Sequence, residues 1–324
     1  MPNILVTGGA GYIGSHTVYQ LLQRGYTVTV LDDLSTGFRD AVPEGHLHIC
    51  SLFDTEQVRE LLVRQKIEAV VHFASFIAVG ESTKEPEKYF TNNVSGSLSL
   101  FTAMGQAGVD KLVFSSTAAV YGNPVSTPIP ETSAIHPVNA YGETKVMVER
   151  VLAWLDQLKG LRSVKLRYFN ACGANPAAGL SERHVPETHL IPLMLKAVVT
   201  GQPMTVFGTD YPTPDGTCIR DYIHVDDLAK AHIVAIDHLL SGGASEAFNV
   251  GTGSGFSVRD MLAAVEKVTG KPVPYTFGER REGDPAELVA DSTKLRTQLG
   301  WSPEFTDLER IVASAWPSEQ LRWA

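Results

Sequence analysis

A hydroxyl, a phenol and an ammonium group are spaced along this sequence so that they could act on one bound ligand. Tyr141 and Lys145 open a helical run and lie four residues apart, on one face of the expected helix. Upstream, the strand-like run Leu112 to Phe114 is followed by Ser115-Ser116-Thr117, which brings a hydroxyl to the end of a strand. Tyr-x-x-x-Lys alone is common on helix surfaces, but together with this hydroxyl it predicts a catalytic set of Thr117, Tyr141 and Lys145.

A glycine-rich segment follows directly after the first strand-like run. It contains Gly-x-Gly-x-x-Gly from Gly9 and a second glycine pattern from Gly8. Glycines here let the backbone turn tightly and approach a pyrophosphate at the N-terminus of the next helix. The second strand leads to Asp32, whose carboxylate would accept hydrogen bonds from an adenosine ribose, and Asp33 would repel the 2′-phosphate of NADP. The sequence therefore predicts NAD as the cofactor.

The catalytic set has an electrostatic requirement. Taking a proton from a substrate hydroxyl as hydride departs needs a base, but free tyrosine, with a pKa of about 10, is mostly protonated at neutral pH. Lowering that pKa by about three units needs about 4 kcal/mol, and one positive charge at about 5 Å supplies roughly 3 kcal/mol at an effective dielectric of about 20. We therefore expect Lys145, together with the oxidised nicotinamide, to lower the pKa of Tyr141.

Short β-branched runs alternate with amphipathic segments through the first half of the chain. This alternation is typical of βαβ units and predicts an α/β fold, a Rossmann-type doubly wound parallel sheet whose ligands sit at the carboxyl ends of the strands. The expected strands are Asn3 to Thr7, Thr27 to Leu31, His46 to Cys50, Ala69 to Phe73, Lys111 to Ser115 and Val164 to Tyr168.

The character of the sequence changes near residue 170. Beyond it, loops rich in proline and glycine surround shorter elements, for example at 174–179, 201–203 and 211–216. We expect an NAD-binding domain over 1–170 and a smaller C-terminal substrate-binding α/β lobe over 171–324, with some of the chain crossing back to the first lobe.

Charge and cysteine usage exclude several classes of partner. The formal net charge of −9 and the lack of a Lys or Arg run argue against nucleic acid. Cys50, Cys172 and Cys218 are widely spaced, which favours a reduced compartment. The chain opens in a strand and has no run of membrane-spanning length, so a cytoplasmic location without membrane contact is expected. His184, His189 and Cys172 match no ligand spacing, and no metal is predicted.

The sequence resembles the extended short-chain dehydrogenase/reductases, and within them the UDP-glucose 4-epimerases, over nearly its whole length. Several of the matching segments fall in the expected second lobe. Besides Gly-Gly-Ala-Gly-Tyr-Ile-Gly-Ser-His, they are Val79-Gly-Glu-Ser, Asn92-Asn-Val, Ala140-Tyr-Gly, Leu166-Arg-Tyr-Phe-Asn170, Phe207-Gly-Thr-Asp-Tyr-Pro-Thr213, Arg220-Asp-Tyr-Ile-His-Val225 and Arg280-Arg-Glu-Gly-Asp284.

The resemblance implies an isomerase that interconverts UDP-glucose and UDP-galactose by transient NAD-dependent oxidation at sugar C4. Tyr141 would be the base, Thr117 would assist at the sugar hydroxyl and Lys145 would hold the nicotinamide ribose. Action could extend to UDP-N-acetylhexosamines. A homodimer is implied through two helices per subunit, at Pro86 to Ala107 and Asn139 to Lys159.

The resemblance also implies two sets of binding residues. Cofactor contacts would come from Gly8, Gly11, Tyr12, Ile13, Gly14, Asp32, Asp33, Ser51, Leu52, Phe73, Ala74, Asn92, Tyr141, Lys145 and Phe169. Substrate contacts would come from Thr117, Tyr141, Asn170, His189, Leu190, Val206, Phe207, Arg220, Arg281, Asp284 and Leu288. Two Arg side chains among these could pair with diphosphate oxygens inside an otherwise acidic protein.

Four positions depart from the family pattern. Ile77 stands where many members have a lysine near the cofactor, and Ser51 replaces the usual aspartate near adenine. His189 replaces a common asparagine of the substrate loop. Leu288 holds the position of a gate residue beside the sugar, and its intermediate size leaves acceptance of N-acetylated sugars open.

Two alternatives to this function stay open. Another nucleotide-sugar epimerase or a 4,6-dehydratase would share the fold, but a dehydratase needs a carboxylic acid just after the active-site hydroxyl, where this sequence has Ala118 and Ala119. A non-catalytic NAD-sensing protein is also compatible with the fold, and the intact Thr117, Tyr141 and Lys145 argue against it.

Overall fold

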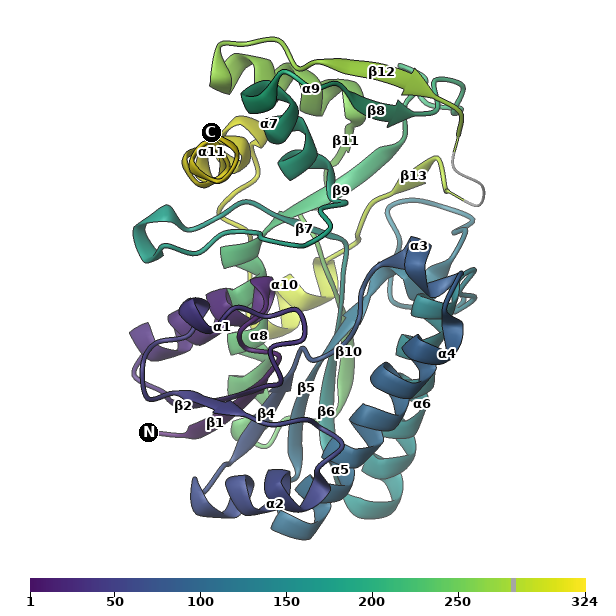
Figure 1. Cartoon of the computed structure of the whole chain (residues 1–324). Coiled ribbons are helices and arrows are strands. Elements are labelled where there is room, and N and C mark those ends of the chain that lie inside the picture. The colour runs from purple at the N-terminus through teal and green to yellow at the C-terminus, as the bar shows by residue number, and fades with distance from the viewer. Residues whose placement is uncertain (281–283) are drawn as a thin grey trace.

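The computed structural model describes residues 1–280 and 284–324 (Figure 1). Within these residues the main core contains a sheet of seven strands in the order β10-β6-β5-β4-β1-β2-β3, with every neighbouring pair parallel. This is a doubly wound Rossmann-type order, so the expected fold class is confirmed. The strands are β1 (Asn3–Thr7), β2 (Thr27–Asp32), β3 (Leu47–Ile49), β4 (Ala69–His72), β5 (Lys111–Thr117), β6 (Arg162–Tyr168) and β10 (Glu246–Val250).

All six strands expected from the sequence are present, with ends that shift by no more than two residues. The seventh, β10, pairs with β6 and brings a later part of the chain back to the large sheet. The functional division at residue 170 stays a prediction.

Helices cover both faces of the large sheet, because apolar side chains project alternately to both faces along its strands. In β1, Ile4 and Val6 join the core on one face and Leu5 joins the core on the other. The first face is covered by α1 (Tyr12–Gln23), α8 (Val225–Leu240) and α10 (Thr293–Leu299), and the second by α2 (Thr55–Arg64), α5 (Gly96–Ala107) and α6 (Ala140–Lys159) (Figure 1). None of the helices described in the structure is both long and apolar enough to cross a membrane.

The connection between β4 and α5 is irregular. It contains two single-turn helices, α3 (Val79–Ser82) and α4 (Pro86–Tyr89), and a π-helical turn at Phe90–Ser95 that runs directly into α5. π-Helical turns are rare and often occur at functional sites.

A second core forms the upper lobe in Figure 1. It packs α7 (Leu190–Thr200), α9 (Val258–Thr269) and α11 (Leu308–Trp323) with the parallel pair β8 (Met204–Phe207) and β12 (Tyr275–Gly278). A separate sheet is built on β9 (Ile219–His224), which pairs with β7 (Asn170–Cys172), β11 (Gly255–Ser257) and β13 (Glu287–Leu288). Since Tyr222 of β9 lies in the second core and Ile223 lies in the first, this strand joins the two lobes.

The ends of α6 fix where its functional residues lie. The Asn139 side chain accepts a hydrogen bond from the Gly142 backbone N–H at 2.8 Å and caps the first turn. Gly160, with φ of 71°, ends the helix in the left-handed conformation that favours glycine. Tyr141 is therefore held in the first turn of α6, with its backbone N–H donating to the Ser82 hydroxyl at 3.2 Å.

Candidate active site

The loop between β1 and α1, with the first turn of α1, forms a cradle in which Gly8 and Gly14 have no room for a side chain. Gly8 has φ of 70°, and a Cβ at this position would lie 2.6 Å from the Ala74 backbone nitrogen. A Cβ on Gly14 would lie 2.2 Å from the Gly8 carbonyl oxygen. Gly11 is the N-cap of α1 and has no capping side chain, so the first backbone N–H groups of the helix can receive an anion. This shape fits the pyrophosphate of a dinucleotide.

Two predicted cofactor residues, Tyr12 and Ile13, provide the first turn of α1. The phenol of Tyr12 points out of the cradle and donates a hydrogen bond to the Gly173 carbonyl at 2.6 Å. Burial, together with the nearby carboxylates, raises the pKa of this phenol well above its usual value. The side chain therefore ties the glycine loop to the chain beyond β7.

Asp32 lies at the end of β2, beside the cradle. Its carboxylate accepts hydrogen bonds from the backbone N–H groups of Ala10 and Leu34, each at 2.9 Å. Burial raises the pKa of this carboxyl, and the two backbone hydrogen bonds oppose the rise. The neighbouring Asp33 carboxylate accepts from the backbone N–H and the hydroxyl of Ser35. Both acids thus lie where the sequence predicts a ribose-binding carboxylate.

The hydroxyl and phenol of the predicted catalytic set meet at the carboxyl end of β5. Thr117 is the last residue of β5, and its hydroxyl hydrogen-bonds the phenol of Tyr141. Tyr141 is 7% exposed. Burial raises the pKa of Tyr141 to about 12, although the Thr117 hydroxyl opposes that rise. In the chain by itself burial therefore sets the direction of this shift, and the expected lowering by Lys145 together with the oxidised nicotinamide stays a prediction.

Lys145 lies one turn further along α6, with its ammonium 5.8 Å from the centre of the Tyr141 ring. The ammonium donates to the Ser75 hydroxyl at 2.7 Å and to the Ser115 carbonyl at 2.9 Å. Burial lowers the pKa of Lys145 to about 7, although Glu149 opposes that change. The structure therefore brings Thr117, Tyr141 and Lys145 together at the carboxyl end of β5.

Two residues that the sequence interpretation missed organise this region. Ser75, after β4, is a hydrogen-bond partner of Lys145. Asn93, in the π-helical turn, is 2% exposed and bonds both backbone groups of Phe76, at 2.8 and 3.0 Å, and the Thr144 hydroxyl at 3.2 Å. The Asn-Asn-Val segment that matches the family lies in this turn, and its second asparagine is the buried one.

The other predicted cofactor residues lie along the carboxyl edge of the sheet. Phe73 follows β4, and its backbone N–H bonds the Thr7 carbonyl at 2.9 Å. Ser51 and buried Leu52 follow β3, and the Asn92 amide bonds the Asn93 side chain at 3.1 Å. Ile77, where a lysine is common in the family, is 41% exposed.

The predicted diphosphate-binding region contains a charged pair. Arg220 on β9 is 9% exposed, and its guanidinium pairs with Asp284. The same guanidinium donates to the Ile219 carbonyl at 2.7 Å, and the Tyr211 hydroxyl donates to Asp284 at 3.2 Å. Arg281, the second predicted guanidinium, lies outside the described residues.

The remaining predicted substrate residues come from several elements of the second half. Leu288 of β13 is paired with Arg220 and packs in a small cluster with Phe169 and with Ala118, next to Thr117. The Asn170 amide donates to the Asp221 carbonyl at 3.1 Å. Leu190 begins α7, while buried Val206 and the more exposed Phe207 lie on β8.

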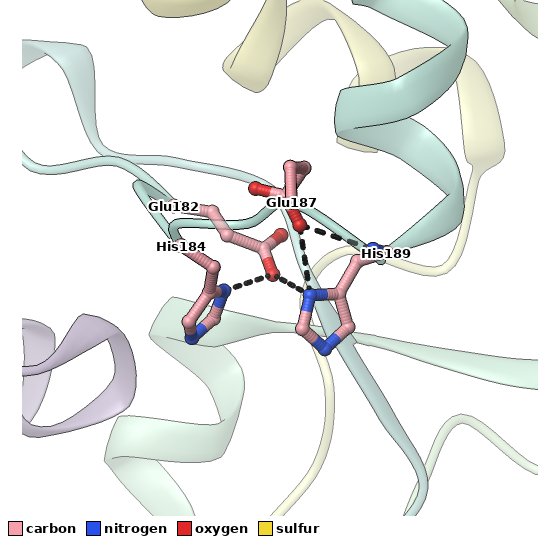
Figure 2. Close-up of side chains that lie close together, drawn as sticks. All are labelled: Glu182, His184, Glu187 and His189. Atoms are coloured by element: carbon pink, nitrogen blue, oxygen red, sulfur yellow. Dashed lines mark hydrogen bonds and ion pairs between the residues drawn. The ribbon is translucent and has the colours of Figure 1, made fainter. Parts of the chain in front are cut away.

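His189, the last predicted substrate residue, belongs to a polar cluster before α7 (Figure 2). Its Nδ1 lies 2.8 Å from Glu182 Oε1 and 3.0 Å from Glu187 Oε1, and His184 Nδ1 lies 3.0 Å from Glu182 Oε1. Burial alone would lower the pKa of His189, but the two carboxylates raise it to about 10. Cys172 is not in the cluster, and its thiol lies 3.4 Å from the Ile223 carbonyl.

Comparisons with known proteins agree with this geometry. The model of the NAD dependent epimerase/dehydratase family matches residues 4–251. A UDP-glucose 4-epimerase from Rhizobium meliloti (strain 1021) is 50% identical over 315 residues, which span 97% of this chain and 96% of that protein. The crystal structure of UDP-glucose 4-epimerase from Brucella ovis in complex with NAD is 44% identical, with a TM-score of 0.96 over 99% of both chains. The enzyme of the same name from Bifidobacterium longum, in complex with NAD+ and UDP, is 36% identical, with a TM-score of 0.93 over 99% of this chain and 100% of the other.

Proposed function

The chain belongs to the NAD-dependent epimerase/dehydratase family, and from this premise we propose that it interconverts UDP-glucose and UDP-galactose. The observation that carries the proposal is the meeting of Thr117, Tyr141 and Lys145 at the carboxyl end of β5. Relatives covering 97% of the chain are UDP-glucose 4-epimerases, and solved relatives bind NAD and UDP, which supports this substrate class.

Tyr141 is proposed as the base. Its phenolate oxygen would take the proton of the sugar 4-hydroxyl as the carbonyl forms, and would return that proton when the hydroxyl is restored. The Thr117 hydroxyl donates a hydrogen bond toward this phenol and would stabilise the phenolate. When bound, NAD would accept the hydride from C4, return it to the other face, and place a positively charged ring in the site.

Lys145 and the glycine cradle are proposed to hold the cofactor. The buried ammonium is fixed by Ser75 and the Ser115 carbonyl, so it has little freedom to move during turnover. The Gly8 and Gly14 positions have no space for a side chain, which supports a close approach by a pyrophosphate. Asp32 would accept hydrogen bonds from the adenosine ribose.

The substrate would be held mainly by its UDP end. Arg220 already has a carboxylate partner in Asp284, and we propose that diphosphate competes for the same guanidinium. Charged anchors at the diphosphate, with few groups committed to the sugar, would leave the 4-keto sugar free to present its other face. Leu288 packs near Ala118, and its size would set tolerance of N-acetylated sugars.

The dehydratase alternative is disfavoured by the residues after Thr117. Ala118 and Ala119 offer no carboxyl group at the position where elimination chemistry needs an acid.

We also propose a homodimer formed through α5 and α6, which lie on the same face of the large sheet (Figure 1). Met147, Trp154 and Leu158 are 37%, 61% and 71% exposed, and their spacing places them on one side of α6. Leu98 on α5 is 43% exposed. We expect light scattering to give a dimer for the natural protein and a monomer for Trp154→Glu with Leu158→Glu, and a natural monomer would contradict the proposal.

The experiment that tests the activity is a substrate panel. Purified protein is incubated with UDP-galactose, UDP-GalNAc and UDP-xylose, with and without added NAD, and products are separated by chromatography. We expect UDP-galactose to be converted to UDP-glucose. A 4-keto-6-deoxy product would identify a dehydratase, and NAD binding without turnover of any sugar would favour the sensing protein.

A further inference from the structure

Four side chains that could ligate a metal ion converge within eight residues before α7, and we call Glu182, His184, Glu187 and His189 the 182–189 cluster (Figure 2). One ligand atom from each lies within 4.8 Å of the other three. Figure 2 shows the Nδ1 atoms of the two imidazoles turned toward the carboxylates of Glu182 and Glu187.

The spacing of these atoms is close to that of a tetrahedral metal site. The distances from the two Nδ1 atoms to Glu182 Oε1 are 2.8 and 3.0 Å, and His189 Nδ1 lies 3.0 Å from Glu187 Oε1. Ligands bound at about 2.0 Å in a tetrahedron lie about 3.3 Å apart. An ion at the centre would require these three contacts to open by a few tenths of an ångström and the wider pairs, which lie within 4.8 Å, to close.

The two carboxylates of the cluster are buried and have one guanidinium nearby. The side chains of Glu182 and Glu187 are 5% and 1% exposed. The Arg322 guanidinium lies 3.4 Å from Glu187. Buried carboxylates need positive partners, so Glu182 requires a second positive group, which either a proton on His189 or a divalent ion between the four side chains would supply.

The surroundings hold the ligands in place. Arg322 on α11 donates to the carbonyls of Glu182 and His184, at 3.0 and 2.7 Å, which fixes the curve of the loop. Glu187 Oε1 accepts from the backbone N–H groups of Thr188 and His189, at 2.9 and 3.0 Å. Supporting hydrogen bonds of this kind orient ligands in known metal sites.

We propose that Glu182, His184, Glu187 and His189 bind one divalent transition-metal ion, with Zn²⁺ the best match. Imidazole with carboxylate ligands suits zinc and its neighbours, whereas Mg²⁺ and Ca²⁺ prefer oxygen alone. Because Arg322 connects the loop to α11, the ion would also stabilise the contact between the loop and the C-terminal helix.

The competing account is a cluster held only by a proton on His189, which would satisfy both carboxylates without an ion. The test uses the full chain without a polyhistidine tag, treated with chelator and exchanged into metal-free buffer. Zn²⁺ is added, unbound metal is removed by gel filtration, and bound zinc is measured by mass spectrometry. We expect one equivalent of zinc per chain and a rise in Tm on zinc addition.

Variants locate the bound ion. His184→Gln and Glu187→Gln should each weaken zinc binding by more than about tenfold, since removing even a supporting residue often costs that much. His136→Gln, at an exposed histidine outside the cluster, should bind zinc as the natural protein does. If a cluster variant fails to fold, Co²⁺ added to the natural protein decides the question, because a tetrahedral site gives a visible absorption spectrum distinct from that of the hydrated ion. Absence of stoichiometric zinc, or unchanged binding in both cluster variants, would overturn the proposal.

Discussion

The cofactor side and the substrate side of the candidate site are built in different ways. The cofactor side is shaped mainly by backbone, since Gly8 and Gly14 exclude side chains and Asp32 is fixed by two backbone N–H groups. The substrate side relies on charged side chains that already have partners, as Arg220 has in Asp284. With the proposed roles, the cofactor would meet a fixed backbone surface, whereas a diphosphate would have to compete with Asp284 for the Arg220 guanidinium.

Tyr141→Phe is expected to have the largest effect, because it removes the proposed proton acceptor between the cofactor side and the substrate side. Turnover of UDP-galactose should fall by about 10² to 10⁴-fold. Binding of NAD and of UDP, measured by calorimetry, should stay within about twofold, since the ring is retained. Tyr26→Phe, distant in sequence and on a surface hydrogen bond with Asp237, is the matched control. Unchanged turnover in Tyr141→Phe would refute the role of this residue.

Gly14→Ala tests whether the cofactor side depends on backbone shape. The added Cβ would meet the Gly8 carbonyl at 2.2 Å, which local side-chain movement cannot relieve. Overpacking of about 3 kcal/mol corresponds to about a hundredfold loss of NAD affinity if the loop is displaced. Gly105→Ala, in open space on α5, is the control and should keep NAD affinity. Normal NAD affinity in Gly14→Ala would show that NAD does not bind against this glycine loop.

Arg220→Gln tests the substrate side alone. Loss of a charge-assisted contact of about 1.5 kcal/mol should weaken UDP binding by about tenfold and leave NAD affinity unchanged. The control is Arg150→Gln, whose guanidinium is 67% exposed and 4.0 Å from its nearest carboxylate. Equal losses of NAD and UDP affinity in Arg220→Gln would contradict the assignment of Arg220 to the substrate side alone.

The pH dependence of stability tests the packing beneath the cofactor side, at His72. It lies beneath the cofactor side, 2% exposed, between the hydroxyls of Thr7 and Ser97. Burial, aided by Lys145, lowers its pKa from 6.5 to about 3. Between pH 6.5 and about pH 3 the unfolded chain binds a proton at His72 and the folded chain does not. The contribution of neutral, buried His72 to the free energy of unfolding is therefore fully present above pH 6.5 and is lost as the pH falls.

The expected slope from His72 is about 1.4 kcal/mol per pH unit below pH 6.5. Urea unfolding at pH 7, 6 and 5 should show a smaller decline in the free energy of unfolding for His72→Gln than for the natural protein. The exposed variant His136→Gln should keep the natural slope. The same decline in all three proteins would exclude His72 as the cause.

The sequence was most informative where neighbours in the chain decide the structure. The glycine pattern and Asp32 follow two strands, and Tyr141 and Lys145 share a helix, so local spacing was enough to place them. Strand β10 was missed because its role comes from pairing with β6, more than 80 residues away. Ser75 was missed for the same reason, being 70 residues from Lys145.

Burial explains the other differences. The expected fall in the pKa of Tyr141 depends on Lys145 and the oxidised nicotinamide acting together, whereas in the chain by itself the loss of water around the phenol raises this pKa. In the 182–189 cluster, the histidines were weighed with Cys172, whereas the fold directs them to Glu182 and Glu187. Side-chain direction within an irregular loop cannot be obtained from spacing alone.

The most direct test of transient oxidation follows the hydrogen on sugar C4. UDP-galactose carrying deuterium at C4 is converted by the natural protein in ordinary water, and the product is examined by mass spectrometry and NMR. We expect UDP-glucose that keeps deuterium at C4, because in transient oxidation the same hydride leaves and returns. Loss of the deuterium to solvent would contradict transient oxidation at C4.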